Sequence, residues 1–349
     1  MTTGLHLRLA TALALAGALV APSLAQAGDL EATFDQTFTK PPAASPAKTP
    51  ALIPFARPAI TSRAVYTSPF EQQIAALASA EQGRIGVAAI DLSSGRSVAV
   101  LGDQPFPMAS TSKVAIVATF LDLADQGKLK LTDSFPLMVP VPSARFSSAV
   151  APVRRGQSIS AQGLIELAIT RSDNQATDAL LAAVGGPTAV NRWLRKTGNA
   201  GIRLDRDIAT LVRDDGAVNP AVTIDQRDSS TPLAMAKLLT GLYQGQWLSS
   251  SSRDVLMGAM SRCVTGRHRM RAMLPEGVRA LHKTGTLSNN SSDVGIIEGP
   301  DGRAFAVAIY VTGQGGKPNR DSRIATIARA LYDGYQAVPT AIQRTAARR

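Results

Sequence analysis

The sequence predicts an α+β fold in which one antiparallel sheet combines N- and C-terminal strands, helices flank the sheet, and an all-helical subdomain is inserted between the two sets of strands. Strand-like runs lie near both ends of the ordered chain, over residues 84–92, 97–102, 278–286, 293–299 and 304–313. Helical periodicity dominates the segment between them, from about 107 to 258. An insertion of this kind leaves a cleft between two subdomains, which is a usual place for an active site.

Each helical part of this architecture has its own pattern. The first helix is expected over 70–82 and the last over 320–336, and both are placed to cover the sheet. The inserted subdomain contains five runs with helical spacing, at 110–129, 160–172, 174–186, 187–198 and 231–245. We therefore expect one catalytic domain over 69–337.

The two ends of the chain have a different character. Residues 1–27 have the pattern of a secretory signal peptide, since Arg8 precedes an apolar stretch and Ala25-Gln26-Ala27 supplies small residues for cleavage. Residues 28–68 are rich in proline and alanine and predict a linker, and residues 338–349 predict a basic tail. The expected location of the mature protein is therefore the periplasm or the extracellular medium.

Composition narrows the function classes. The chain has 349 residues, of which 45% are apolar, enough for a sizeable core. Its formal net charge of +11 becomes +10 when Arg8 is removed, but no basic run interleaves with aromatic residues, which argues against nucleic acid as a partner. Because no later segment approaches about 20 uninterrupted apolar residues, we expect no membrane span. We expect a monomer that uses no cofactor.

Few side chains are available for metal binding. The histidines are His6, His268 and His282, and Cys263 is the one cysteine. These residues do not supply a usual zinc site, and a Ser-His-Asp triad is disfavoured by the same shortage of histidine. We therefore expect no metal, and we interpret His282 as a packing or capping residue.

Three short motifs carry the chemistry: Ser110-Thr111-Ser112-Lys113, Ser172-Asp173-Asn174 and Lys283-Thr284-Gly285. Each alone is a weak signal, since a serine before a helix is commonly an N-cap and the other two fit ordinary element ends. Together, in this order and in an exported chain, they form the motif set of serine β-lactamases and penicillin-binding proteins.

The first two motifs predict the reacting groups. Ser110 is the predicted nucleophile, and Lys113, one helical turn away on the same face, takes or relays its proton. Ser172 is placed to protonate the leaving lactam nitrogen. Asn174 is placed to hold the amide of the substrate's side chain.

The third motif predicts groups that hold the substrate. Lys283 and Thr284 offer a charge and a hydroxyl to the substrate carboxylate. The backbone N–H groups of Ser110 and of Thr286, next to this motif, are the expected donors to the oxyanion.

The chain from about 69 to 337 resembles a class A β-lactamase well beyond these motifs. The likeness extends to Gly185-Gly186-Pro187, to the run Arg-Leu-Asp-Arg at 203–206, and to the segments that begin at Arg227 and Thr265. The resemblance implies the fold and cleft inferred above, and β-lactam hydrolysis through an acyl-enzyme on Ser110.

The resemblance also assigns a carboxylate anchor. In some class A enzymes an arginine at the place of Arg269 faces the substrate carboxylate. The strand that follows Lys283-Thr284-Gly285, where other members place theirs, has no arginine here. Arg269 therefore inherits the role, and the alternative is a solvated residue in a basic patch with Arg267 and Arg271.

Arg206 and Asp228 are expected to form the salt bridge that closes the Ω-loop. The chain departs from the family in the segment between these two residues. Class A enzymes follow this arginine almost at once with a glutamate and, four residues later, with an asparagine, which together hold the hydrolytic water. Here the loop is longer and contains no glutamate. Counting back from Asp228 places Asp215 as the base and Asn219 as the asparagine, with the insertion ahead of them. The alternatives are Asp207, Asp214 and an ordinary polar loop.

The predicted function is hydrolysis of β-lactam antibiotics, so β-lactam small molecules are the expected partners, with peptidoglycan peptides as a further class. Two other functions stay open. One is a penicillin-binding, D,D-peptidase-like enzyme that is acylated but slow to release the product. The other is an inactive homologue that binds wall fragments.

Overall fold

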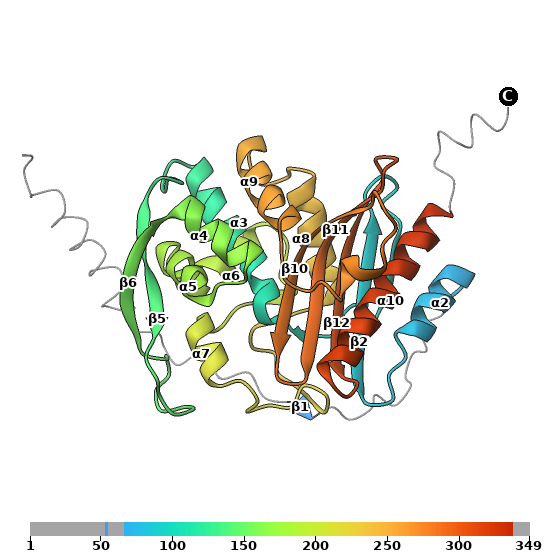
Figure 1. Ribbon diagram of the computed structural model, residues 1–349, viewed down its shortest axis with the longest axis horizontal. Coiled ribbons are helices and arrows are strands. Elements are labelled where there is room, and N and C mark those ends of the chain that lie inside the picture. Colours follow the sequence, from blue (N-terminus) through green and yellow to red (C-terminus); the bar gives the residue numbers. More distant parts are fainter. Residues whose placement is uncertain (1–52, 55–65, 338–349) are drawn as a thin grey trace, which may run out of the picture. The chain divides into compact units, whose positions relative to one another are not determined.

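The computed structural model describes residues 53–54 and 66–337. Its centre is a five-stranded antiparallel sheet in the order β10-β11-β12-β2-β3 (Figure 1). The C-terminal strands are β10 (Arg279–Leu287), β11 (Asn290–Glu298) and β12 (Ala304–Gly313), and the N-terminal strands are β2 (Gly83–Asp91) and β3 (Ser97–Val100). The predicted sheet of N- and C-terminal strands is therefore confirmed.

Both faces of this sheet are covered by apolar side chains. Successive residues of a strand point to opposite faces, so Val307 and Ile309 enter one core while Ala306 and Ala308 enter the other. Helices α2 (Pro69–Leu77) and α10 (Lys317–Gln336) lie beside each other against the first face (Figure 1). The ring of Tyr335 stacks on Phe305 there, with 4.8 Å between centroids.

The second face packs against α8 (Pro232–Tyr243), which joins the sheet to the inserted subdomain. The other long helices of this subdomain are α3 (Lys113–Asp125), α4 (Ala161–Thr170), α5 (Asn174–Ala183), α6 (Gly186–Lys196) and α9 (Ser250–Ser261). Four of these helices begin with a side-chain cap. The side-chain oxygens of Ser160 (α4), Asp173 (α5), Thr231 (α8) and Ser249 (α9) each accept a backbone N–H of the first turn.

The inserted part is not entirely helical, which corrects the sequence prediction in detail. Strands β5 (Ser134–Pro140) and β6 (Val153–Ser160) form a two-stranded sheet at its edge, and α7 (Ile208–Arg213) is a short helix. Three further pairs of residues form a small sheet, β4 (Phe106–Pro107), β7 (Ile202–Arg203) and β9 (Ser229–Ser230). Strand β6 was missed because it is largely polar, and β4, β7 and β9 because two residues are too few to show a period.

The predicted linker 28–68 also contains a short strand. Residues Ile53–Pro54 form β1 and pair antiparallel with β8 (Thr223–Ile224) in the Ω-loop. The signal peptide 1–27 and the basic tail 338–349 lie outside the described residues and stay predictions. Within the described part of the chain, no helix is both long and apolar enough to cross a membrane.

Candidate active site

Ser110 lies on a 3₁₀ turn, Ala109–Ser112, that runs directly into α3. Its neighbour Ala109 has φ of 49°, a left-handed conformation that costs an L-residue roughly 1 kcal/mol. Neither the turn nor α3 has a side-chain cap, so Ser110 is not used as an N-cap. Its side chain instead lines a cavity between the sheet and the helical subdomain.

Lys113, the first residue of α3, is fully buried behind this turn. Its ammonium donates to the Ser172 carbonyl and to Asn174 Oδ1, both at 2.7 Å, and lies 3.3 Å from Ser172 Oγ. These partners are neutral oxygens. Burial, and then the charge of Lys283, lower the pKa of Lys113 well below its usual value, so a neutral amine is accessible to it.

Ser172 joins the two lysines. Its φ of 59° is a second left-handed conformation at the site, and it presents Oγ to Lys283 Nζ at 3.0 Å as well as to Lys113. A hydroxyl has two acceptor lone pairs and one donor hydrogen. Ser172 also lines the Ser110 cavity, so its hydroxyl is accessible from there.

Lys283 and Thr284 come from β10, the strand at the edge of the sheet. Lys283 is completely buried, and desolvation lowers its pKa to about 8. The Thr284 hydroxyl lies 2.6 Å from that of Thr265. The cavity, of about 300 Å³, brings together most of the predicted residues and is lined by Ser110, Ser172, Asn174, Thr265, Gly266, Arg269, Thr284, Thr286 and Lys317.

Arg269, the predicted carboxylate anchor, lines the Ser110 cavity but is buried. Only 2% of it is exposed, and its Nε forms an ion pair with Asp321 at 2.7 Å. The same guanidinium donates to the Gly285 carbonyl at 2.8 Å and to Thr286 Oγ1 at 2.7 Å. It is neither a solvated residue nor a free cation, because its donors bind the end of β10.

Lys317 is a site residue that sequence reasoning missed. It lines the Ser110 cavity from the start of α10, is about half exposed, and pairs with Asp321. A cation in the first turn of a helix opposes the helix dipole. That mismatch is a signal in the sequence that could have drawn attention to Lys317.

Comparisons with known proteins agree with this geometry. The Beta-lactamase enzyme family matches residues 69–335. The chain is 33% identical to β-lactamase CTX-M-25 of Escherichia coli, covering 76% of this chain and 89% of the relative. A solved ancestral class A β-lactamase of Gram-negative bacteria is 36% identical with a TM-score of 0.66, covering 76% of this chain and 99% of that one. A solved β-lactamase from Chitinophaga pinensis is 26% identical with a TM-score of 0.67, covering 77% and 100%.

The chain belongs to the class A β-lactamase family. The expected family is thus confirmed. The Ω-loop of this family member is closed as the sequence suggested, because Arg206 Nε lies 2.6 Å from Asp228 Oδ2.

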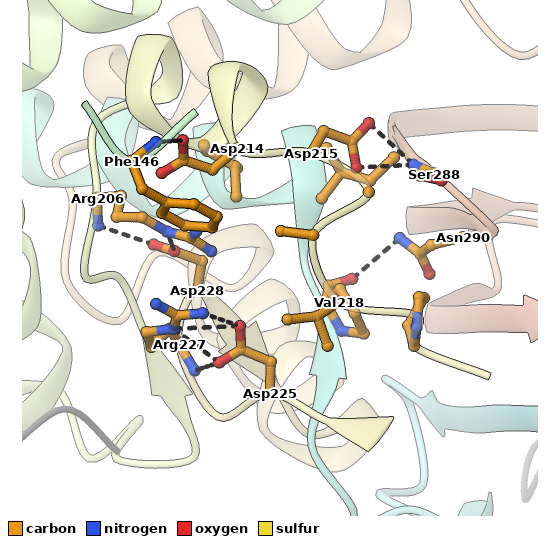
Figure 2. A pocket seen from close by; sticks show the side chains of 16 residues that line it. Phe146, Arg206, Asp214, Asp215, Val218, Asp225, Arg227, Asp228, Ser288 and Asn290 are labelled. Atoms are coloured by element: carbon orange, nitrogen blue, oxygen red, sulfur yellow. Dashed lines mark hydrogen bonds and ion pairs between the residues drawn. The ribbon is translucent and has the colours of Figure 1, made fainter. Parts of the chain in front are cut away.

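Within that Ω-loop, Asp215 is bound away from Ser110. Both of its carboxylate oxygens accept the backbone N–H of Ser288, at 2.9 and 3.0 Å (Figure 2). Asn219 accepts from the side-chain amide of Asn289 at 2.8 Å. Asp215 lines a cavity that shares no lining residue with the Ser110 cavity. The structure therefore does not bring the predicted base to the predicted nucleophile.

The two rival carboxylates are also engaged elsewhere. Asp207 caps α7 by accepting Thr210 N–H, and Asp214 pairs with Arg213 and accepts Phe146 N–H. The pairing with Arg213 lowers the pKa of Asp214, which keeps it charged.

Helix α7, which follows Arg206 almost at once, is the part of the Ω-loop that borders the site. Asp178 fixes it there by accepting the N–H groups of Ile208 and Ala209 at 2.7 and 2.8 Å. Asn174 lies one turn before Asp178 on the same face of α5. Burial raises the pKa of Asp178 to about 7. Asp215 and Asn219 lie after α7, in the part of the loop that leads to β8.

The surface of α7 beside Asn174 is apolar. A second cavity of about 270 Å³ lies between this helix and the β5–β6 loop, and Asn174 lines both this cavity and that of Ser110. From α7 it is lined by Ile208, Ala209, Val212 and Arg213. No carboxylate faces either cavity from the described residues that line them.

Proposed function

We propose that this chain hydrolyses β-lactams through an acyl-enzyme on Ser110, and that formation of the acyl-enzyme is much faster than its hydrolysis. The observation that carries the first half is the hydroxyl of Ser172, held between the amines of Lys113 and Lys283 in the cavity that Ser110 lines.

The proposed acylation step uses groups of the Ser110 cavity and of its surroundings. Neutral Lys113 accepts the proton of Ser110 as its Oγ attacks the lactam carbonyl. The negative charge that develops on the carbonyl oxygen is stabilised by backbone N–H groups of Ser110 and Thr286. Ser172 then donates its hydrogen to the lactam nitrogen as the carbon–nitrogen bond breaks, and Lys113 returns a proton to Ser172. The net change is an ester on Ser110 and an opened ring.

Lys283 supports binding of the ring's carboxylate. It is charged below a pKa of about 8 and donates to the Thr284 carbonyl at 2.9 Å, and Thr284 itself lines the cavity. Arg269 acts through Thr286, because its guanidinium holds that side chain and the end of β10.

Deacylation lacks an evident base, which is the specific observation that favours a second candidate. Hydrolysis of an ester at neutral pH needs a base within hydrogen-bond reach of a water. The side of the site that α7 supplies is lined by Ile208, Ala209 and Val212. A penicillin-binding enzyme that keeps its acyl group is therefore the second candidate.

One experiment separates these functions. Stopped-flow mixing with a chromogenic cephalosporin, followed by intact mass and peptide mapping, should give a burst of one equivalent, an adduct on Ser110 and a slow steady rate. A burst with no steady rate supports the penicillin-binding candidate. Absence of any adduct, or an adduct that persists in Ser110→Ala, contradicts both and leaves the inactive wall-fragment binder.

We also propose export of the protein, on the pattern of residues 1–27. N-terminal sequencing of protein recovered from the periplasm or medium tests this proposal. A start at Gly28 supports it, and recovery of uncleaved protein in the cytoplasm alone contradicts it.

A further inference from the structure

The turn between β10 and β11 is held from outside the sheet by the Ω-loop. Leu287 pairs with Asn290, so Ser288 and Asn289 form a two-residue turn, and Asn289 adopts a left-handed φ of 53°. Asp215 accepts the N–H of Ser288 (Figure 2). Asn219 accepts the side-chain N–H of Asn289. Both residues of the turn are therefore bound by one short segment of the Ω-loop.

That segment is itself anchored. Asp215 N–H donates to the Val212 carbonyl at 3.3 Å, so its carboxylate is carried on the last turn of α7. Next to it, Arg213 donates to the Ser148 carbonyl at 2.8 Å and Asp214 accepts Phe146 N–H at 3.2 Å. Asn219 Oδ1 also accepts Ala221 N–H at 3.1 Å. The two side chains that reach the turn thus come from a backbone fixed to the β5–β6 loop.

The turn matters for catalysis because of its place on β10. In the five-stranded sheet, β10 is the first strand and has a strand neighbour only in β11. Thr284 and Thr286 of this strand line the Ser110 cavity. An edge strand lacks the second row of backbone hydrogen bonds that fixes a central one. One residue, Leu287, separates Thr286 from the bound Ser288 amide.

We infer that Asp215 and Asn219 are positioning residues that latch the Ω-loop onto the β10–β11 turn and so hold Thr286 in place for acylation. This inference rests on the proposed function for its catalytic consequence. It replaces the predicted role of Asp215 as a base, since its carboxylate faces a backbone N–H at the surface and not the Ser110 cavity.

The two roles make opposite predictions for two substitutions. In Asp215→Asn the amide oxygen still accepts the Ser288 N–H, while a base at this position would be lost. In Asp215→Ala both the latch and the carboxylate disappear. The burst and steady phases with a chromogenic cephalosporin report acylation and deacylation separately. The control is Asp254→Ala, which removes a carboxylate exposed on α9.

We expect Asp215→Ala to slow the burst by about threefold to tenfold, as for loss of one surface hydrogen bond, and Asp215→Asn to restore most of that rate. The slow phase should be unchanged in both. Asn219→Ala should slow the burst by a smaller factor. An unchanged burst in Asp215→Ala overturns the latch, and accumulation of acyl-enzyme in Asp215→Asn with a normal burst restores Asp215 as the base.

Hydrogen exchange keeps the inference testable if no β-lactam reacts. The Ser288 amide should exchange at least several times faster in Asp215→Ala than in the parent chain, and Asp215→Asn should protect it. Equal protection in all three proteins overturns the latch. Loss of protection without any acylation would instead leave the latch standing and contradict the proposed function.

Discussion

The Ser110 cavity and the Ω-loop use their charged groups in opposite ways. In the cavity, the amines of Lys113 and Lys283 are buried against neutral oxygens, and burial lowers the pKa of each. Between residues 205 and 228, every carboxylate accepts a backbone N–H, an arginine or both. These carboxylates belong to Asp205, Asp207, Asp214, Asp215, Asp225 and Asp228.

The difference separates groups that react from groups that hold the backbone. A lysine without a carboxylate partner in a dry site can lose its proton at neutral pH, which a base or relay requires. A carboxylate that accepts several hydrogen bonds is stabilised in its charged form and fixes the segment that donates to it. This contrast supports the proposal that an ester forms on Ser110 faster than it is hydrolysed.

The largest effect should come from removing an amine of the cavity. Lys113→Ala should slow the burst by about 10²- to 10⁴-fold, as expected for loss of a general base or relay. Lys237→Ala, which removes an exposed lysine on α8, should leave the burst unchanged. A burst rate within threefold of the parent rate would remove Lys113 from the mechanism. It would also contradict the view that the buried amines react while the Ω-loop carboxylates hold the backbone.

Breaking the ion pair behind Thr286 should be costly in a different way. Arg269→Ala leaves the buried Asp321 with the half-exposed Lys317 as its partner, so we expect the free energy of unfolding to fall by about 3 kcal/mol in addition to a rise in KM. Chemical denaturation measures the first and steady-state kinetics the second. Arg267→Ala, at an exposed neighbour, should change neither. An Arg269→Ala protein of full stability with only KM raised would favour a free anchor at this position.

The pH dependence of the burst rate and of KM should report the titration of the two buried amines. Lys113 must be neutral to accept a proton, so the burst rate should fall as pH drops through its lowered pKa. Lys283 must be charged to attract a carboxylate, so KM should rise several-fold as pH rises past about 8. With a β-lactam analogue whose ring carboxylate is esterified, the burst rate should still fall at low pH, but KM should no longer rise at high pH. A KM that is flat from pH 7 to 9.5 would contradict the second assignment.

The smallest effect is expected at the rim. Lys317→Ala should raise KM about twofold to fivefold, because a half-exposed cation contributes little to binding in water. The effect should shrink as salt is raised toward 1 M, where screening shortens the range of charges to about 3 Å. An effect of Lys317→Ala that does not change with salt would point to packing instead of charge.

The sequence could predict those parts of the site whose residues are close together along the chain. Ser110 with Lys113, and Ser172 with Asn174, stand within short motifs at element boundaries, so their shared cavity follows from the fold. The burial of Arg269 could not be predicted, because its partner Asp321 lies 52 residues further along the chain.

The position of α7 could not be predicted for a similar reason. Its start is held by Asp178, a buried carboxylate on another helix, and counting from Asp228 cannot detect that contact. An aspartate within the apolar helical run at 174–186 was the available signal. The β5–β6 pair was missed because its stability comes from packing of Phe135, Leu137 and Met138 against the helical core.

The left-handed backbone at Ala109 and Ser172 sets up a conflict between two kinds of selection. Glycine adopts that conformation without the cost that a Cβ imposes, so Ala109→Gly relieves local strain. The same change gives the unfolded chain more freedom and loosens the residue before Ser110. Variants of Ala109 and Ser172 selected for heat resistance alone should therefore differ from variants selected for survival on a β-lactam. The second selection should retain a residue other than glycine at both positions.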